Sequence, residues 1–312
     1  MSPTATAPPG PRSTAQEIRL LARNNKLTSN TSGLAQAHLQ ANLLVLPSRY
    51  AHDFRLLCAR NPVTCPLIAE STTVGHYNSL KSHLPTHSSV NASNDPSLHH
   101  DIDIRRDIPR YNVYQNSTLT KSHVPDIIPE WTPDHIAFLI GCSFSFEAAL
   151  TAADLPPLHT LQGRNVAMYR TNTPLAPAGV FTGGTAVVSM RAYKRSQVEL
   201  VRQITRAYVA THGEPLAWGW DALGLLGIRD IDCPEWGDAP LGLSGGLLGQ
   251  ERRSDTNVDG EEDELVPVFW GCGVTPQEAV MGARLEGCVM AHAPGHMLVL
   301  DWGVQDVIGS EG

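Results

Sequence analysis

Two stretches of this chain combine the same residue types in the same order. Residues 138–150 (FLIGCSFSFEAAL) and 268–280 (VFWGCGVTPQEAV) each pass from an apolar segment through a Gly-Cys pair into a segment with Glu-Ala. A strand that ends in small residues before a helix presents unpaired backbone N–H groups at the positive end of the helix dipole, where an anion can bind. We therefore expect one small acidic ligand to lie between the two turns. The expected contacts from the turns are Ser143, Gly273 and Thr275.

The cysteines of the two turns, Cys142 and Cys272, favour a second interpretation. Cofactor-independent amino-acid racemases use one thiol on each face of the α-carbon, one as thiolate base and the other as thiol acid. Two points oppose it: the spacing from Cys to Glu differs by one residue between the two stretches, and a buried, inert thiol is the commonest role of such a cysteine. Catalytic thiols are therefore the alternative hypothesis.

Three arginines could grip a carboxylate. Arg170 and Arg191 stand at the ends of apolar segments, and Asn172 follows the first of them; Arg164 is a weaker third. A guanidinium group binds a carboxylate bidentately, so Arg170, Asn172 and Arg191 are expected to bind substrate. The structural alternative is that each arginine pairs with an acidic residue of the protein.

Proton transfer could be carried by Glu147 with His292 or His296. Apolar neighbours of Glu147 would raise the pKa of its carboxyl group towards neutrality, whereas Glu278 is explained by a capping box that begins at Thr275. The two histidines have a metal-like spacing, but Pro-Gly lies between them, so we expect no metal site and favour proton transfer. The alternative is a buried imidazole that bonds a carbonyl group.

Composition excludes several classes of function. The chain has 312 residues, 42% hydrophobic residues and a formal charge of −8 without a basic stripe, so nucleic acid is not an expected partner. No apolar run is long enough for a bilayer span, and six cysteines without a CxxC motif suggest reduced thiols in the cytoplasm. The helix expected over 14–27 is interpreted as part of the mature protein, and an organelle-import segment is the weaker hypothesis. No phosphate-binding glycine motif appears, so we expect no cofactor. The expected partner is a small acidic substrate, and a homo-oligomer is possible.

Secondary-structure signals alternate between helix and strand, which predicts an α/β fold with mixed sheets. Capping boxes begin helices at Thr14 and Ser196, a helix runs from Ser48 to Arg60, and two short strands flank the turn at 294–295. The expected domains are a disordered tail (1–13), a main α/β domain (14–155 with 265–312), a second, smaller α/β domain (156–242) and an acidic linker insertion (243–264).

Several strings along the chain carry a resemblance to a known family. They are QANLLVLP, DIDIRRDIPRY, GCSFSFEAAL, GRNVAMYRTN, PAGVF, VVSMRAY, VPVFWGCGVTPQEAV and HAPGHMLV, in this order. Over about residues 33 to 300 the chain resembles the D-glutamate cyclase-like family of hydro-lyases. The resemblance implies two interlocked α/β domains and the cyclisation of D-glutamate to 5-oxo-D-proline with loss of water. The insertions at 71–100 and 243–264, and Trp218 and Trp220, depart from the family pattern. A protein that only binds an acidic metabolite is a further alternative.

Overall fold

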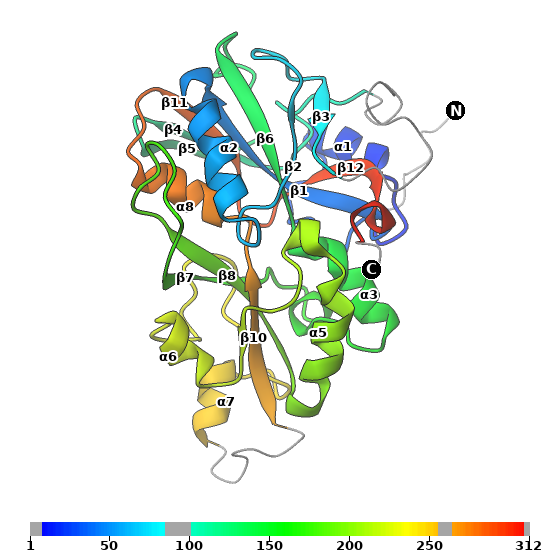
Figure 1. Ribbon diagram of the computed structural model, residues 1–312. Coiled ribbons are helices and arrows are strands. Elements are labelled where there is room, and N and C mark those ends of the chain that lie inside the picture. Colours follow the sequence, from blue (N-terminus) through cyan, green and yellow to red (C-terminus); the bar gives the residue numbers. More distant parts are fainter. Residues whose placement is uncertain (1–7, 85–100, 255–263, 309–312) are drawn as a thin grey trace, which may run out of the picture.

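A computed structural model describes residues 8–84, 101–254 and 264–308, whose strands form two β-sheets with helices packed around them (Figure 1). The larger sheet has the strand order β3-β2-β6-β1-β11-β4-β5, and β12 also pairs with β1. Its strands are β1 (His38–Pro47), β2 (Leu67–Ser71), β3 (Leu80–Ser82), β4 (Tyr111–Gln115), β5 (Thr118–Val124), β6 (His135–Gly141), β11 (Cys288–His292) and β12 (Leu298–Gly303).

The smaller sheet has the order β7-β8-β10-β9. Its strands are β7 (Ala167–Pro174), β8 (Thr185–Lys194), β9 (Ala217–Trp218) and β10 (Leu265–Gly271). The helices are α1 (Ala15–Arg23), α2 (Ala51–Arg60), α3 (Glu147–Ala152), α4 (Leu158–Leu161), α5 (Val198–Arg206), α6 (Ala222–Leu226), α7 (Leu248–Ser254) and α8 (Thr275–Gly282). Short 3₁₀ turns include Ser48–Tyr50, Ser143–Phe146, Arg195–Gln197, Val209–Thr211 and Val304–Val307.

The α/β class with two sheets confirms the predicted fold class, but the strand pairing differs from the mixed pairing that we expected. Every strand pair within the described residues is antiparallel. The reason is visible at β1 and β2, which α2 connects. Antiparallel β6 lies between these two strands, so they run in the same direction without being neighbours.

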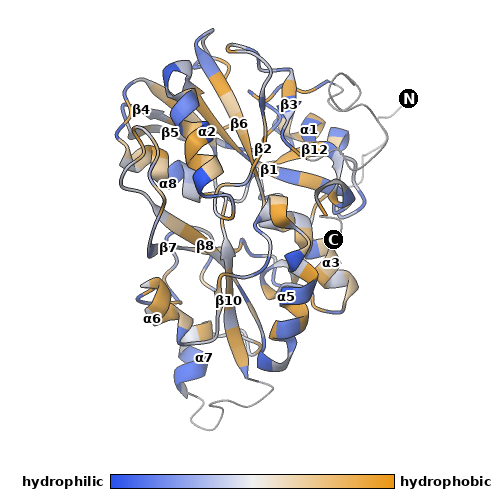
Figure 2. Cartoon of the chain, in the orientation of Figure 1, coloured by the Kyte–Doolittle hydropathy of each residue, from blue (hydrophilic) through white to orange (hydrophobic). Residues whose placement is uncertain are grey.

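Alternate residues of β1 belong to two hydrophobic cores, as the two-residue period of a strand requires. Leu43 and Val45 pack in a core that also contains Trp270 of β10, whereas Leu44 and Leu46 pack with α2 and α8. The first of these cores therefore joins the larger sheet to the smaller one. Figure 2 shows hydrophobic and hydrophilic residues alternating around α2 and α5, whose apolar sides cover these cores.

Local signals are confirmed at some helix ends and wrong at others. Thr14 and Glu17 form the predicted capping box of α1, and α2 ends at Arg60. The predicted cap at Ser196 is wrong, because a 3₁₀ turn over 195–197 leads into α5 without a side-chain cap. The strands around Gly295 exist, but β11 and β12 do not pair with each other; both pair with β1, one after the other along it.

The predicted division into domains stays a proposal. Sheet membership groups β10 with β7, β8 and β9, so we propose that the smaller domain includes β10 and that the boundary lies after Gly271. The proposed acidic linker contains α7 at Leu248–Ser254, and its residues 255–263 lie outside the described part of the chain. Residues 1–7 of the tail and 85–100 of the insertion at 71–100 also lie outside the described part of the chain. Among the helices that the structure describes, none has the length and apolar composition of a membrane span.

Candidate functional site

The two Gly-Cys turns meet in the middle of the molecule. Strand β6 ends there from the larger sheet and β10 from the smaller one (Figure 1). Cys142 and Cys272 belong to one buried apolar cluster, together with Phe144 and Val274 of the same turns and Val187 of β8. The turns therefore converge, as the sequence predicts, but apolar side chains pack in the contact between them.

Polar contacts fix both turns to their neighbours. The side-chain amide of Asn42 in β1 donates to the carbonyl oxygen of Gly141, at 3.0 Å, and lies so close to Gly273 that a Cβ there would overlap it. The hydroxyl group of Thr275 bonds the backbone N–H and C=O groups of Val187, at 2.9 and 3.1 Å. Gly273 and Thr275, which the sequence predicts as ligand contacts, therefore make contacts within the protein. The predicted cap of α8 by Thr275 is also not formed.

The thiols of the two turns are held in their neutral form. Burial raises the pKa of Cys142 well above its usual range and raises the pKa of Cys272 to about 11. The backbone N–H of Phe144 donates to the sulfur of Cys142, at 3.5 Å. Because the thiolate is the reactive form, these pKa shifts favour inert thiols over catalytic ones.

Next to the first turn, a buried ion pair joins β8 of the smaller sheet to α3, the helix that follows β6 of the larger sheet. Arg191 of β8 and Glu147 of α3 are 2% and 3% exposed, and Nε of Arg191 donates to Oε1 of Glu147 at 2.9 Å, with a second contact from Nη2. Arg191 also donates to the hydroxyl group of Ser143, at 3.1 Å, and its guanidinium group lies 5.4 Å from the ring centre of Trp270. Ser143, an expected substrate contact, therefore supports Arg191.

The pKa of Glu147 moves opposite to our expectation. Burial alone would raise the pKa of this carboxyl group, but the positive charge of Arg191, followed by the contact with His159, holds it below its usual value. Glu147 is therefore an ionised carboxylate at neutral pH. Apolar neighbours alone predicted the wrong direction, because the partner arginine was not visible in the sequence.

His159 of α4 is a member of this network that sequence reasoning missed. Its Nε2 lies 3.4 Å from Oε1 of Glu147, and the hydroxyl group of Ser32 lies 3.4 Å from Oε2 of the same carboxylate. The ring of Phe144 stacks against the imidazole, with 6.4 Å between ring centres. His159 and Glu147 belong to separate short helices, so no regular spacing in the sequence relates them. The string GRN (163–165), which follows α4, is the nearest sequence feature that points to this part of the site.

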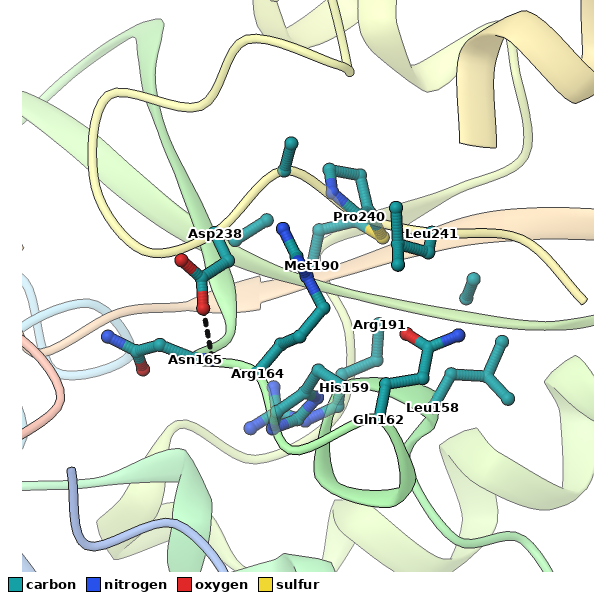
Figure 3. Close-up of a pocket in the computed structure, with 13 residues that line it drawn as sticks. Leu158, His159, Gln162, Arg164, Asn165, Met190, Arg191, Asp238, Pro240 and Leu241 are labelled. Atoms are coloured by element: carbon teal, nitrogen blue, oxygen red, sulfur yellow. Dashed lines mark hydrogen bonds between the residues drawn. The ribbon is translucent and has the colours of Figure 1, made fainter. Parts of the chain in front are cut away.

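A pocket opens beside the network, between α4, β7, β8 and the segment 238–241 (Figure 3). Its empty space is about 320 Å³ when the open solvent at its mouth is included, of which about 20 Å³ can hold the centre of a water molecule. His159, Arg164 and Arg191 lie together along it, and Asp238 stands opposite (Figure 3). Asp238 accepts the backbone N–H of Asn165, at 2.7 Å. Within the described residues, Arg164 has no hydrogen-bond acceptor for its buried Nε and no ion pair.

Comparisons with known proteins place this chain in a family. A family model described as D-glutamate cyclase matches residues 136–301. This chain belongs to the D-glutamate cyclase family. Similar proteins named "putative hydro-lyase" occur in Schizosaccharomyces pombe, 42% identical over 91% of this chain and 83% of the relative, and in Bordetella petrii, 42% identical over 92% and 94%. A third, from Staphylococcus haemolyticus, is 39% identical over 93% and 95%. The D-glutamate cyclase family member described here is thus a carbon–oxygen lyase of the hydro-lyase type.

Two residues expected to bind substrate lie outside the pocket of this D-glutamate cyclase family member. The side chain of Arg170 is 47% exposed and pairs with Glu278 at 2.7 Å, while Asn172 is exposed on the same strand. Arg170 therefore connects β7 to α8 through an ion pair with an acidic residue of the protein, which is the structural alternative to substrate binding. Glu278 pairs with Arg170 and does not form the predicted capping box with Thr275.

The two histidines expected to move protons also lie outside the pocket lining. His292 is fully buried, with Nδ1 3.1 Å from the carbonyl oxygen of Leu43 and 2.9 Å from the amide of Gln277. His296 contacts the carbonyl oxygens of Pro294 and Thr28. Both histidines match the alternative of an imidazole that bonds carbonyl groups, and their catalytic role stays an untested prediction. Across the described ranges, no group of three or more His, Cys, Asp or Glu side chains could hold a metal ion.

Buried neutral histidines predict that this D-glutamate cyclase family member loses stability in acid. Burial lowers the pKa of His292 from 6.5 to about 4, and the same holds for His212. Such a group contributes stability above its unfolded pKa, and this stability is lost as the pH falls towards the folded pKa. We expect each histidine to cost about 2 kcal/mol of unfolding free energy between pH 7 and pH 5.

Urea unfolding at pH 7 and pH 5 measures this effect. The variant His292→Gln keeps a hydrogen-bonding side chain without a titrating group, so the difference in its unfolding free energy between the two pH values should be smaller than that of the unmodified protein. An equal difference in both proteins would contradict the neutral state assigned to His292.

Proposed function

We propose that the chain cyclises D-glutamate to 5-oxo-D-proline with loss of water, in the pocket beside Arg164 and Arg191. Membership of the D-glutamate cyclase family supports this substrate. The observation that carries the proposal is a guanidinium group without a partner in the described residues, that of Arg164, next to the buried Arg191–Glu147–His159 network. A guanidinium group that no acidic side chain of the described part of the chain pairs with, placed at a pocket, favours an acidic ligand.

The chemistry of this cyclisation matches the charges of the pocket. The α-ammonium group must lose a proton before its nitrogen attacks the γ-carboxylate, and the negative charge of that carboxylate must be balanced. The charge of Arg191 is already offset by Glu147, at a hydrogen-bond distance of 2.9 Å, which leaves Arg164 to face the substrate. We therefore assign the carboxylate-binding role to Arg164, the weakest of the three arginines on sequence grounds.

Substitution of Arg164 tests this role. Arg164→Gln should lower kcat/KM for D-glutamate roughly 10- to 100-fold, the equivalent of the ~1.5–3 kcal/mol of a charge-assisted hydrogen bond. The measurement is formation of 5-oxoproline, followed by NMR, with D- and L-glutamate in parallel. Arg170→Gln is the matched control, because Arg170 lies outside the pocket lining and pairs with Glu278. Equal losses of kcat/KM in both variants would contradict the role assigned to Arg164. Absence of any turnover by the unmodified protein would contradict the proposed reaction.

A two-cysteine racemase is a second candidate, because Cys142 and Cys272 share one cluster. Their burial and raised pKa values oppose it. Incubation with D-glutamate in heavy water separates the two reactions: a racemase introduces deuterium at the α-carbon, while a cyclase forms the lactam without exchange. Binding of D-glutamate with neither outcome after long incubation would support the third candidate, a protein that only binds an acidic metabolite.

A further inference from the structure

One nitrogen of His159 has no partner in the described structure although it is buried. The side chain of His159 is 11% exposed, and its Nδ1 makes no hydrogen bond to any described residue. The other ring nitrogen, Nε2, lies near three oxygens, those of Glu147, Ser32 and Thr160, at 3.3 to 3.4 Å. A buried polar atom without a partner costs free energy, so such an atom in a pocket lining points to a ligand.

The partner of Nε2 determines which nitrogen carries the proton. The hydroxyl group of Ser32 donates to Oε2 of Glu147, at 3.4 Å, so the oxygen of Ser32 can only accept from the imidazole, and an ionised carboxylate likewise only accepts. We therefore assign the ring proton to Nε2. In the neutral imidazole the second nitrogen then has a free lone pair. The charge of Arg191, bonded to the same carboxylate oxygen, keeps Glu147 in the ionised form that this arrangement needs.

We propose that His159 is the proton-transfer residue of this reaction and that Glu147 is its positioning residue; the inference rests on the proposed cyclisation of an amino dicarboxylate. Nδ1 of His159 takes one proton from the α-ammonium group of the substrate. The freed amine attacks the carbon of the γ-carboxylate, a C–N bond forms, and one C–O bond breaks. The leaving oxygen receives the proton from His159 and a second proton from the nitrogen, and departs as water.

Kinetics of a conservative variant test the proton-transfer role. His159→Gln keeps a hydrogen-bonding side chain but cannot exchange a proton near neutral pH, so kcat should fall by about 10²- to 10⁴-fold with little change in KM, and the limb of the pH–rate profile that reports the base should disappear. His52→Gln is the matched control, since His52 is exposed on α2, lies outside the pocket lining and should leave kcat unchanged. An unchanged kcat in His159→Gln, in a protein that does cyclise D-glutamate, would overturn the proposal.

Nitrogen-15 NMR of the imidazoles tests the positioning role without any turnover. The neutral form of the His159 imidazole should be protonated at Nε2 and not at Nδ1, and this preference should be lost in Glu147→Gln. The opposite tautomer in the unmodified protein, or an unchanged tautomer in a folded Glu147→Gln variant, would overturn the assignment. Absence of lactam formation by the unmodified protein would instead count against the proposed cyclisation, so the two failures are distinguishable.

Discussion

Replacement of Glu147 by alanine is expected to lower the free energy of unfolding by about 3–5 kcal/mol, because it leaves the charge of a buried arginine without a partner. Arg191 is 2% exposed, and Glu147 is its carboxylate partner in the described structure. The hydroxyl groups of Ser143 and Ser189 remain as acceptors, but neither carries a charge. Urea unfolding measures the loss.

Two controls separate the unpaired charge from the loss of packing. Glu278→Ala removes the partner of Arg170, whose side chain is 47% exposed, and should cost only about 0–1 kcal/mol because solvent screens that pair. The double variant Glu147→Leu with Arg191→Met removes both buried charges together and should cost much less than Glu147→Ala alone. Similar costs for Glu147→Ala and Glu278→Ala would show that burial of the Arg191–Glu147 pair has no energetic consequence.

Replacement of Gly141 by alanine should destabilise the protein by about 3 kcal/mol, since overpacking of a fixed backbone forces the chain to shift. A Cβ at this position would overlap the backbone carbonyl oxygen of Ala210, and a backbone atom cannot move aside as the end of a side chain can. Gly141 is the last residue of β6 and the glycine of the first Gly-Cys turn. The substitution is therefore expected to displace Ser143 and Glu147 as well and to lower activity.

The matched control for Gly141→Ala is a glycine in open space. At Gly224, within α6, an added Cβ would meet no atom of another described residue within 4 Å, and the backbone φ is ordinary. Alanine there should stabilise the protein by about 0.4–1 kcal/mol, because alanine has fewer conformations than glycine in the unfolded chain. Chemical denaturation of both variants gives the comparison. A cost below about 0.5 kcal/mol for Gly141→Ala, the range of an ordinary surface substitution, would contradict the close approach to Ala210.

The sequence predicted much of the local structure and little of the site. The capping box at Thr14 was readable because its two partners are three residues apart, and α2 stops at Arg60 because Asn61-Pro62 follows. The site depends on pairs far apart in sequence: 44 positions separate Arg191 from Glu147, and 108 separate Arg170 from Glu278. Residue types alone made Arg170 and Arg191 equal candidates, and their partners distinguish them.

The sequence by itself determined the α/β class, the two Gly-Cys turns and the resemblance to the D-glutamate cyclase family, because each of these lies in short strings of adjacent residues. Only the tertiary structure decided that the turns pack against each other with neutral thiols, that Glu147 is ionised, and that His159 and Arg164 face the pocket. The physical reason is that a pKa and a binding role depend on which charges and ring atoms surround a group. Those neighbours come from separate strands and loops that folding brings together.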